Sequence, residues 1–444
     1  MSPAESPIPA SPAPLPSGLR RLFGNLAKLL GGKAAAGLLS LVYLVIVAHQ
    51  LGANDYGVLM LVNAYAVTVG SIVAFSGFHG VVRYGALILA REDRAGLARL
   101  IRFMTLLELG CGVAAVIVAA VGAPLIAPHL GWSDQVTKIA MIYSLAVAAT
   151  VRATPQGVLQ LADRFDLIAL HQTVSPVTRM IGVLIVWMLG GGLAGYLIVW
   201  LASSVAEGVA MWILALPSWR RLVKGQTLFG PWRGVLDEHD GFFRFITVTN
   251  FDITLRELTP NLIPLTVGWL VGPHAAGMLA LAQRATNLLQ QPAVLLSQAS
   301  YSVLAEQVAN RFFPQLRSTV IRSTAIAMAA GIAIVVALTR FGDALVVALG
   351  GHSFAAAGML LVLVGIGRAC ALASAPSAAA LTALGRPGRS VAVALVTNVA
   401  LYPLLPVLLS RLGTDGAGWH VLIQNLIAFF LLLAFFMRDV EKAA

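Results

Sequence analysis

Apolar stretches of about twenty residues recur along almost the whole chain, separated by short polar connections. A helix of that length crosses the hydrocarbon core of a bilayer, because each residue adds ~1.5 Å along the helix axis. Charged residues make up 11% of the sequence, whereas an ordinary soluble domain contains about 25%. The mean hydropathy is +0.85. Together these features predict an all-α polytopic membrane protein.

The pattern predicts about twelve transmembrane helices in two groups of six. The expected spans are 28–49, 58–79, 101–125, 136–160, 167–189, 193–216, 243–270, 276–303, 318–340, 354–376, 389–410 and 417–437. We expect four parts: a disordered Pro-rich cytoplasmic tail over 1–18, an N-terminal six-helix bundle over 19–216, a cytoplasmic linker over 217–242 and a C-terminal six-helix bundle over 243–444.

Basic residues are concentrated in alternate connections, which is the bias that orients membrane proteins. The connection after the second span contains Arg83, Arg91, Arg94, Arg99 and Arg102. The central linker contains Arg220, Arg221, Lys224 and Arg233. The opposite connections hold little beyond Lys138, Arg340 and Arg411. This asymmetry places both termini in the cytoplasm, and it accounts for the net charge of +11 without a nucleic-acid partner.

Three short motifs occur twice in the same order, about half a chain length apart. The matched pairs are Gly52/Gly272 and Gly57/Gly277 (offset 220), Leu159/Leu381 and Arg164/Arg386 (offset 222), and Gly195/Gly418 with Tyr196/Trp419 (offset 223). Small residues are common in membrane helices, but three matches at nearly one offset are more specific than any single match. They predict that the two bundles are pseudo-symmetric about an axis along the membrane normal.

The stretch "LGANDYGVLMLVNA", followed by "GFHGVVRYGA" with Gly80 and Arg83, resembles the start of polysaccharide and O-antigen flippases. These form a family of the multidrug/oligosaccharidyl-lipid/polysaccharide exporter superfamily. "PQGVLQLADRF" resembles the end of that family's fourth span, and the similarity covers most of the chain. The resemblance implies two bundles around a central cavity that opens alternately to each side of a bacterial inner membrane. Its polysaccharide members move polyprenyl-pyrophosphate-linked oligosaccharides outward, for O-antigen, capsule or exopolysaccharide, whereas the drug-exporting branch exchanges cationic compounds for protons or sodium.

Ionisable residues at bilayer depth are costly, so they usually face a cavity or a partner. The candidate substrate contacts are Lys33, Arg152, Arg179, Arg256, Arg284 and Arg368. The candidate ion-coupling acids are Glu108, Glu207, Asp252 and Glu257. Cations therefore outnumber acids, which favours an anionic substrate. Lys33 has the alternative of snorkelling to the interface, and Arg152 and Arg368 that of contacting lipid headgroups.

Arg179 is the most informative of these residues, because no acid lies near it in the sequence. Its guanidinium suits a pyrophosphate or an acidic sugar, since its forked donors match phosphate oxygens. The alternative is a structural ion pair with Glu108 or Glu207 of another helix.

The eighth span carries an unusual number of amide side chains, which suggest the lining of a wet cavity for sugar hydroxyls. They are Gln283, Asn287, Gln290 and Gln291, with Arg284 at the edge of their helical face. Interhelical hydrogen bonding is the alternative interpretation.

The seventh span combines charges with two prolines. Asp252 and Arg256 are spaced to form a local ion pair, which would leave Glu257 as the unpaired acid. Pro260 and Pro264 each remove a backbone donor, so we expect a kink or break there that acts in a gate. A structural proline is the alternative.

No catalytic, nucleotide-binding or metal-binding motif stands out, so the sequence predicts no enzyme, no cofactor and no metal site. The stretch "DEHD" at 237–240 is interpreted as solvated polar sequence. Two alternatives to a flippase remain open: a multidrug or organic-cation antiporter, and a membrane glycan polymerase or ligase. Besides lipid-linked oligosaccharide and membrane lipids, we expect other polysaccharide-assembly proteins as partners and a monomeric state.

Overall fold

The computed structural model describes residues 17–227, 230–235, 241–287 and 303–443, with the backbone alone at 17–35 and at Arg256. The described residues form helices and connections without a β-strand. The first half contains α1 (Ser17–Val73), α2 (Phe78–Ala90), α3 (Arg94–Ile126), η1 (Ala127–Leu130), α4 (Asp134–Tyr143), η2 (Ser144–Thr150), α5 (Ala153–Leu161), α6 (Phe165–Met188) and α7 (Leu193–Leu222). The second half contains α9 (Phe242–Leu270), α10 (Pro273–Asn287), α12 (Phe313–Gly350), η3 (His352–Ala357), α13 (Gly358–Ala383), α14 (Pro387–Leu395), η4 (Val396–Ala400), α15 (Leu404–Leu412) and α16 (Asp415–Ala443).

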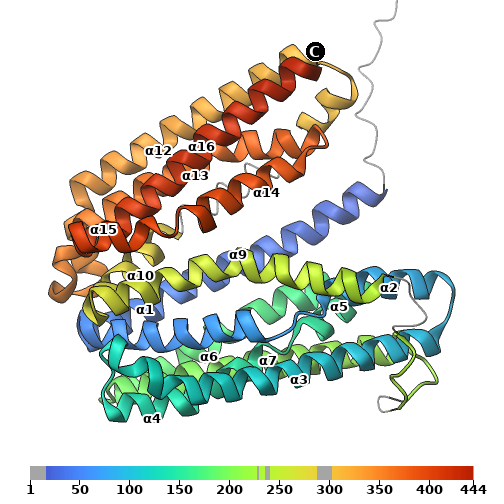
Figure 1. Ribbon diagram of the computed structural model, residues 1–444, viewed down its shortest axis with the longest axis horizontal. Coiled ribbons are helices and arrows are strands. Elements are labelled where there is room, and N and C mark those ends of the chain that lie inside the picture. Colours follow the sequence, from blue (N-terminus) through green and yellow to red (C-terminus); the bar gives the residue numbers. More distant parts are fainter. Residues whose placement is uncertain (1–16, 228–229, 236–240, 288–302, 444) are drawn as a thin grey trace, which may run out of the picture.

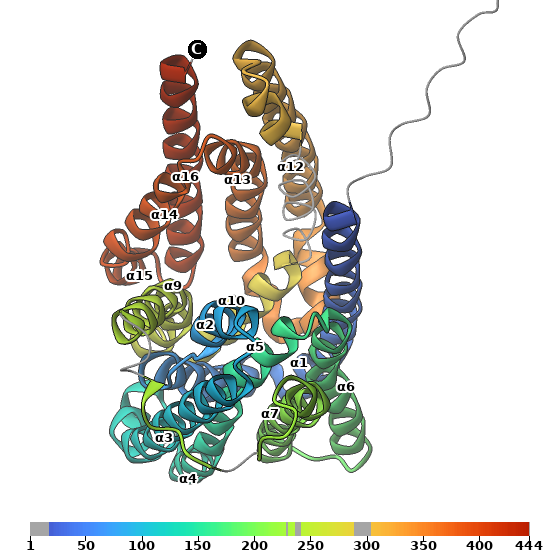
Figure 2. The ribbon, with the colours of Figure 1, turned by 90° about the vertical axis from the view of Figure 1, so that its right-hand side faces the viewer.

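These helices form two bundles that meet at one end of the molecule and spread apart toward the other (Figures 1 and 2). Both described chain ends lie at the spread end. The largest hydrophobic core contains residues of both bundles, such as Tyr56 of α1 and Phe354 of η3. A separate core of the C-terminal bundle, built around Leu316 and Phe436, contains no residue of the first bundle. The apolar cores are therefore continuous at the closed end and divided at the open end.

Within the described residues, eight helices are long and apolar enough to cross a membrane, or nine if the bent pair α14–η4 and α15 counts as one span. Three local features explain why fewer than the twelve expected spans are counted. The first two expected spans form one helix, α1, which is kinked at Gly52. The seventh, α9, is less apolar because it carries charged and polar side chains. The eighth begins as α10, and its continuation over 288–302 lies outside the described residues.

Two expectations about span limits were wrong. The region between the second and third expected spans was predicted as a connection, but it is helical except for 91–93. Apolar residues at helical spacing, such as Val81 and Ile88, are buried there, and isolated arginines did not interrupt the helix. The fourth span was predicted as one helix, but it breaks between η2 and α5 beside Arg152.

The internal repeat is present in the backbone. The amide of Arg164 donates to the carbonyl of Leu159 at 2.9 Å, and the amide of Arg386 donates to that of Leu381 at 2.9 Å. The first repeated turn also recurs, because Gly52 has φ +68° and Gly272 has φ +111°. Side chains are strained in that region of φ, so glycine is needed at both turns.

Helix α9 links the two bundles. In its first half, Asn250 accepts a hydrogen bond from the Ser76 amide at 2.9 Å, and Thr254 donates to the Ser71 carbonyl at 3.0 Å. In its second half, the Thr266 hydroxyl lies 2.5 Å from that of Tyr402 in the C-terminal bundle. Helix α9 continues through Pro260 and Pro264, so of the expected kink or break there is no break. Its neighbours on both sides hold α9 in place.

The central connection is docked on the first bundle. Arg102 of α3 is buried, and it donates to the carbonyls of Thr227 and of Pro231, the latter at 3.0 Å. Helix α7 extends to Leu222, so the connection is shorter than the predicted linker. The "DEHD" stretch at 237–240 lies outside the described residues.

Candidate functional site

A cavity of about 180 Å³ lies inside the N-terminal bundle. It is bounded by the second leg of α1, by α4 and η2, and by α6 and α7. Its polar lining consists of Asn63, Tyr143, Thr150, Arg152, Arg179, Ser204 and Glu207. Three of the predicted site residues therefore meet in one cavity: Arg152, Arg179 and Glu207.

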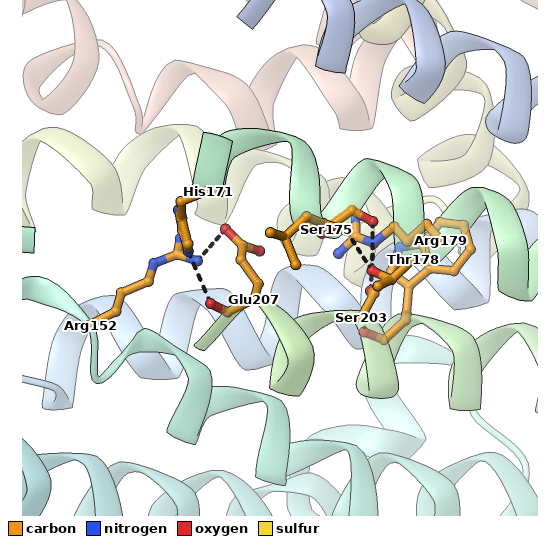
Figure 3. Close-up of polar contacts among 9 residues, drawn as sticks. Arg152, His171, Ser175, Thr178, Arg179, Ser203 and Glu207 are labelled. Atoms are coloured by element: carbon orange, nitrogen blue, oxygen red, sulfur yellow. Dashed lines mark hydrogen bonds and ion pairs between the residues drawn. The ribbon is translucent and has the colours of Figure 1, made fainter. Parts of the chain in front are cut away.

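Arg179 is held by neutral groups. Its Nε donates to Ser203 Oγ at 2.9 Å, and its guanidinium lies 5.0 Å from the ring centroid of Trp200 (Figure 3). Ser203 in turn donates to the Trp200 carbonyl at 2.8 Å. Within the described part of the chain, no carboxylate forms an ion pair with Arg179. Its position is fixed, and no acid of the described ranges pairs with its positive charge.

Glu207, which the sequence offered as a partner for Arg179, pairs with Arg152 instead (Figure 3). The backbone carbonyl of Glu207 also lies 2.9 Å from Nε2 of His171. These contacts connect the start of α5 with α6 and α7. The charges of Arg152 and Glu207 cancel each other, so Arg179 gives the cavity its net positive charge.

Glu108 has a different role from the other acids. Its side chain is fully buried, and its two oxygens accept from the amides of Ala153 at 2.6 Å and Thr154 at 2.8 Å. Those amides begin α5 and have no partner within that helix. Glu108 therefore caps the second part of the broken fourth span and positions Arg152 at the cavity.

We expect Glu108→Ala to destabilise the protein more than Glu108→Gln. The alanine variant leaves two buried amides without a partner, at about 1–3 kcal/mol each, whereas glutamine keeps one acceptor oxygen. Thermal unfolding of purified protein in detergent measures the difference. Glu257→Ala is the matched control, because Glu257 is an exposed acid on α9. Equal melting temperatures for wild type and Glu108→Ala would contradict the capping role.

The C-terminal bundle contributes a second set of predicted residues. Arg368 of α13 donates through Nη2 to Asn287 Oδ1 of α10 at 3.1 Å. Gln283 and Arg284 are half-buried on α10, and Arg284 has no carboxylate partner among the described residues. Gln290 and Gln291 lie outside the described residues.

Arg179 and Arg284 converge on one side chain, although they belong to different bundles. Both lie close enough to the hydroxyl of Tyr43 to interact with it electrostatically. Tyr43 is buried on the first leg of α1, where its ring packs edge-on against Trp200 at 5.7 Å. The first leg of α1 therefore lies within electrostatic range of both arginines.

The remaining predicted residues lie elsewhere or have side chains outside the description. Asp252 is half-buried and Glu257 is exposed on α9. Arg256 and Lys33 are placed by their backbones in α9 and α1. In the described parts of the chain, no three His, Cys, Asp or Glu side chains gather in a geometry for a metal ion.

Sequence reasoning missed several residues that line or support the cavity. They are Tyr43, Asn63, Tyr143, His171, Trp200, Ser203 and Ser204. A signal was present on α6 and α7. His171, Ser175 and Arg179 recur every four residues, and polar residues at 203, 204 and 207 share one face of α7. A polar stripe on an apolar helix marks such a lining better than the charged residues alone.

A family model described as "Polysaccharide biosynthesis protein" matches residues 23–308, which is more than half of the chain. The chain belongs to this family. It is also similar to the inner membrane protein YghQ of Escherichia coli (strain K12), with 26% identity over 286 residues, 64% of this chain and 79% of that protein.

Solved structures share the fold at low identity. An inward-facing multidrug resistance MATE family transporter of the MOP superfamily superposes with a TM-score of 0.72 at 14% identity, covering 92% of this chain and 95% of that one. The lipid II flippase MurJ in an inward closed conformation superposes with a TM-score of 0.65 at 14% identity, covering 93% and 88%. The predicted fold class, an all-α membrane protein of two bundles, is confirmed.

Proposed function

We propose that this protein is a flippase that moves polyprenyl-pyrophosphate-linked oligosaccharide from the inner to the outer leaflet of the bacterial inner membrane, for cell-surface polysaccharide assembly. The observation that carries the proposal is the positive charge of Arg179 and Arg284, neither of which forms an ion pair with a carboxylate in the described parts of the chain. One comes from each bundle, and both act electrostatically on the Tyr43 hydroxyl. The family membership and the fold of known exporters are consistent with it.

The chemistry of the two arginines suits a pyrophosphate. Dehydrating two adjacent phosphates is costly, and guanidinium groups replace lost water with charge-assisted hydrogen bonds. The side chains of Asn63, Ser204 and Asn287 offer hydrogen bonds to sugar hydroxyls. The polyprenyl tail stays in lipid while the headgroup crosses between the bundles, which open alternately to each side.

The cation antiporter is less well supported. A site for organic cations needs an available acid, and the two candidate acids at bilayer depth in the first bundle are engaged: Glu207 pairs with Arg152, and Glu108 caps α5. The likeness to a multidrug transporter concerns the fold. A glycan polymerase or ligase is also less well supported, because the short connections between spans leave little room for a catalytic domain at the membrane surface.

Deleting the gene tests the proposal directly. We expect cells without the protein to accumulate polyprenyl-pyrophosphate oligosaccharide in the inner leaflet, and wild-type protein to clear it. Lipid extraction and mass spectrometry, with a leaflet-selective probe, measure the accumulation. If no such lipid accumulates while sensitivity to cationic drugs rises, the antiporter replaces the flippase.

A further inference from the structure

The two repeated glycine turns touch each other at the closed end of the molecule. A Cβ on Gly57 would overlap the backbone carbonyl of Pro273, and a Cβ on Gly277 would overlap that of Ala53. Each added Cβ would also lie 3.0 Å from the amide nitrogen of the other glycine. The contact is reciprocal, because Ala53 and Gly57 correspond to Pro273 and Gly277 at the same offset. We call these four residues the glycine crossing.

The glycine crossing joins the two bundles through their backbones. Gly57 lies on the second leg of α1, and Gly277 lies on α10. The reciprocal contact places the crossing on the approximate two-fold axis that relates the bundles. Backbones approach this closely only where side chains are absent.

Ring contacts between the bundles surround the glycine crossing. Tyr56 of α1 packs edge-on against Phe354 of η3 at 5.7 Å. His129 of η1 stacks on Trp269 of α9 with ring centroids 4.3 Å apart. These contacts lie in or beside the shared hydrophobic core, whereas the C-terminal bundle has a core at the open end that contains no residue of the first bundle. The glycine crossing is therefore part of the interface that holds the two bundles together at the closed end.

We propose that the glycine crossing is the gate at this end: it closes only when positions 57 and 277 both lack side chains, and it separates when the pathway opens there. This inference rests on the proposed function, because a gate implies transport. The closure of the crossing, however, is measurable without any substrate. Backbone-to-backbone contact suits a gate, since it parts without rearranging interlocked side chains.

The test uses a reporter thiol at the crossing. The native thiols are removed by Cys111→Ala and Cys370→Ala, and Ala53→Cys is added where the wild-type side chain is 2% exposed. In lipid nanodiscs, we expect a water-soluble maleimide to label this thiol slowly. Adding Gly277→Val should speed labelling about tenfold or more, because overpacking disfavours the closed contact. Gly110→Val on α3 is the matched control, since a Cβ there meets nothing within 4 Å.

A second measurement separates opening of the gate from local distortion. His129→Cys and Trp269→Cys replace the stacked rings, and a short bifunctional maleimide links them when this end is closed. We expect Gly277→Val to reduce the cross-linking yield about tenfold, whereas a local distortion at Ala53 would leave it unchanged. If the valine variant is not monodisperse, Gly277→Ala and Gly57→Ala introduce smaller side chains that overpack the glycine crossing less.

Unchanged labelling and unchanged cross-linking in a monodisperse Gly277→Val protein would overturn the gate. The outcome is independent of the substrate. If labelling responds as expected but deletion of the gene causes no lipid accumulation, the proposed function fails while the gate stands. If the lipid accumulates but labelling does not respond, the flippase stands and this gate is wrong.

Discussion

Arg179→Ala should reduce clearance of the lipid-linked oligosaccharide about tenfold to hundredfold. A hydrogen bond to a charged group contributes about 1.5–3 kcal/mol, and each ~1.4 kcal/mol changes a rate or affinity tenfold. The variant should remain folded, because the wild-type guanidinium contacts neutral side chains such as Ser203 and Trp200 and forms no ion pair with an acid among the described residues. Clearance is measured as the rate at which the accumulated lipid disappears after the gene is induced in deleted cells.

Two further substitutions make the result specific to Arg179. Arg179→Lys keeps the charge but loses the forked donors, so we expect an intermediate rate. Arg322→Ala removes an exposed arginine of α12 and should leave the rate unchanged. If all three variants clear the lipid at the wild-type rate, the flippase survives but Arg179 is a structural charge. If Arg179→Ala is inactive and Arg179→Lys is fully active, charge alone matters and bidentate binding is wrong.

The overall architecture could be predicted because its signals are local or periodic. Apolar runs predicted most helices, and the matched turns at Gly52 and Gly272 predicted the two-fold repeat without any knowledge of contacts between the bundles. Positive φ at both glycines explains why the motif survives twice in one chain. The position of Arg179 at a cavity could also be predicted, since an arginine deep in an apolar run without a neighbouring acid is unusual.

The partners of the charged residues could not be predicted, because helix packing decides them. Arg152 and Glu207 are 55 residues apart, and Glu108 is 45 residues from the amide of Ala153 that it caps. No periodicity within one helix indicates which helices will be neighbours. The break beside Arg152 was missed for the same reason, since a buried carboxylate from α3 stabilises the new helix start.

Breaking the ion pair between Arg152 and Glu207 should have the second large effect. Glu207→Ala leaves the Arg152 guanidinium without its acid at the cavity wall, and it adds one positive charge beside Arg179. We expect lower stability and slower release of an anionic substrate, seen as a slower clearance rate. The side chains are 36% and 21% exposed, so solvent screens part of the cost of breaking the pair. Thermal unfolding and lipid clearance are measured on the same variant.

A double-mutant cycle distinguishes a positioned ion pair from two independent charges. Arg152→Gln with Glu207→Gln removes both charges and keeps similar volumes, so it should recover much of the stability that either single change loses. A coupling of about 1–3 kcal/mol is typical of residues in direct contact. If the losses of the single variants simply add, the contact does not stabilise the fold. If stability recovers but clearance does not, the pair takes part in transport itself, because its charges are then needed after the fold has been restored.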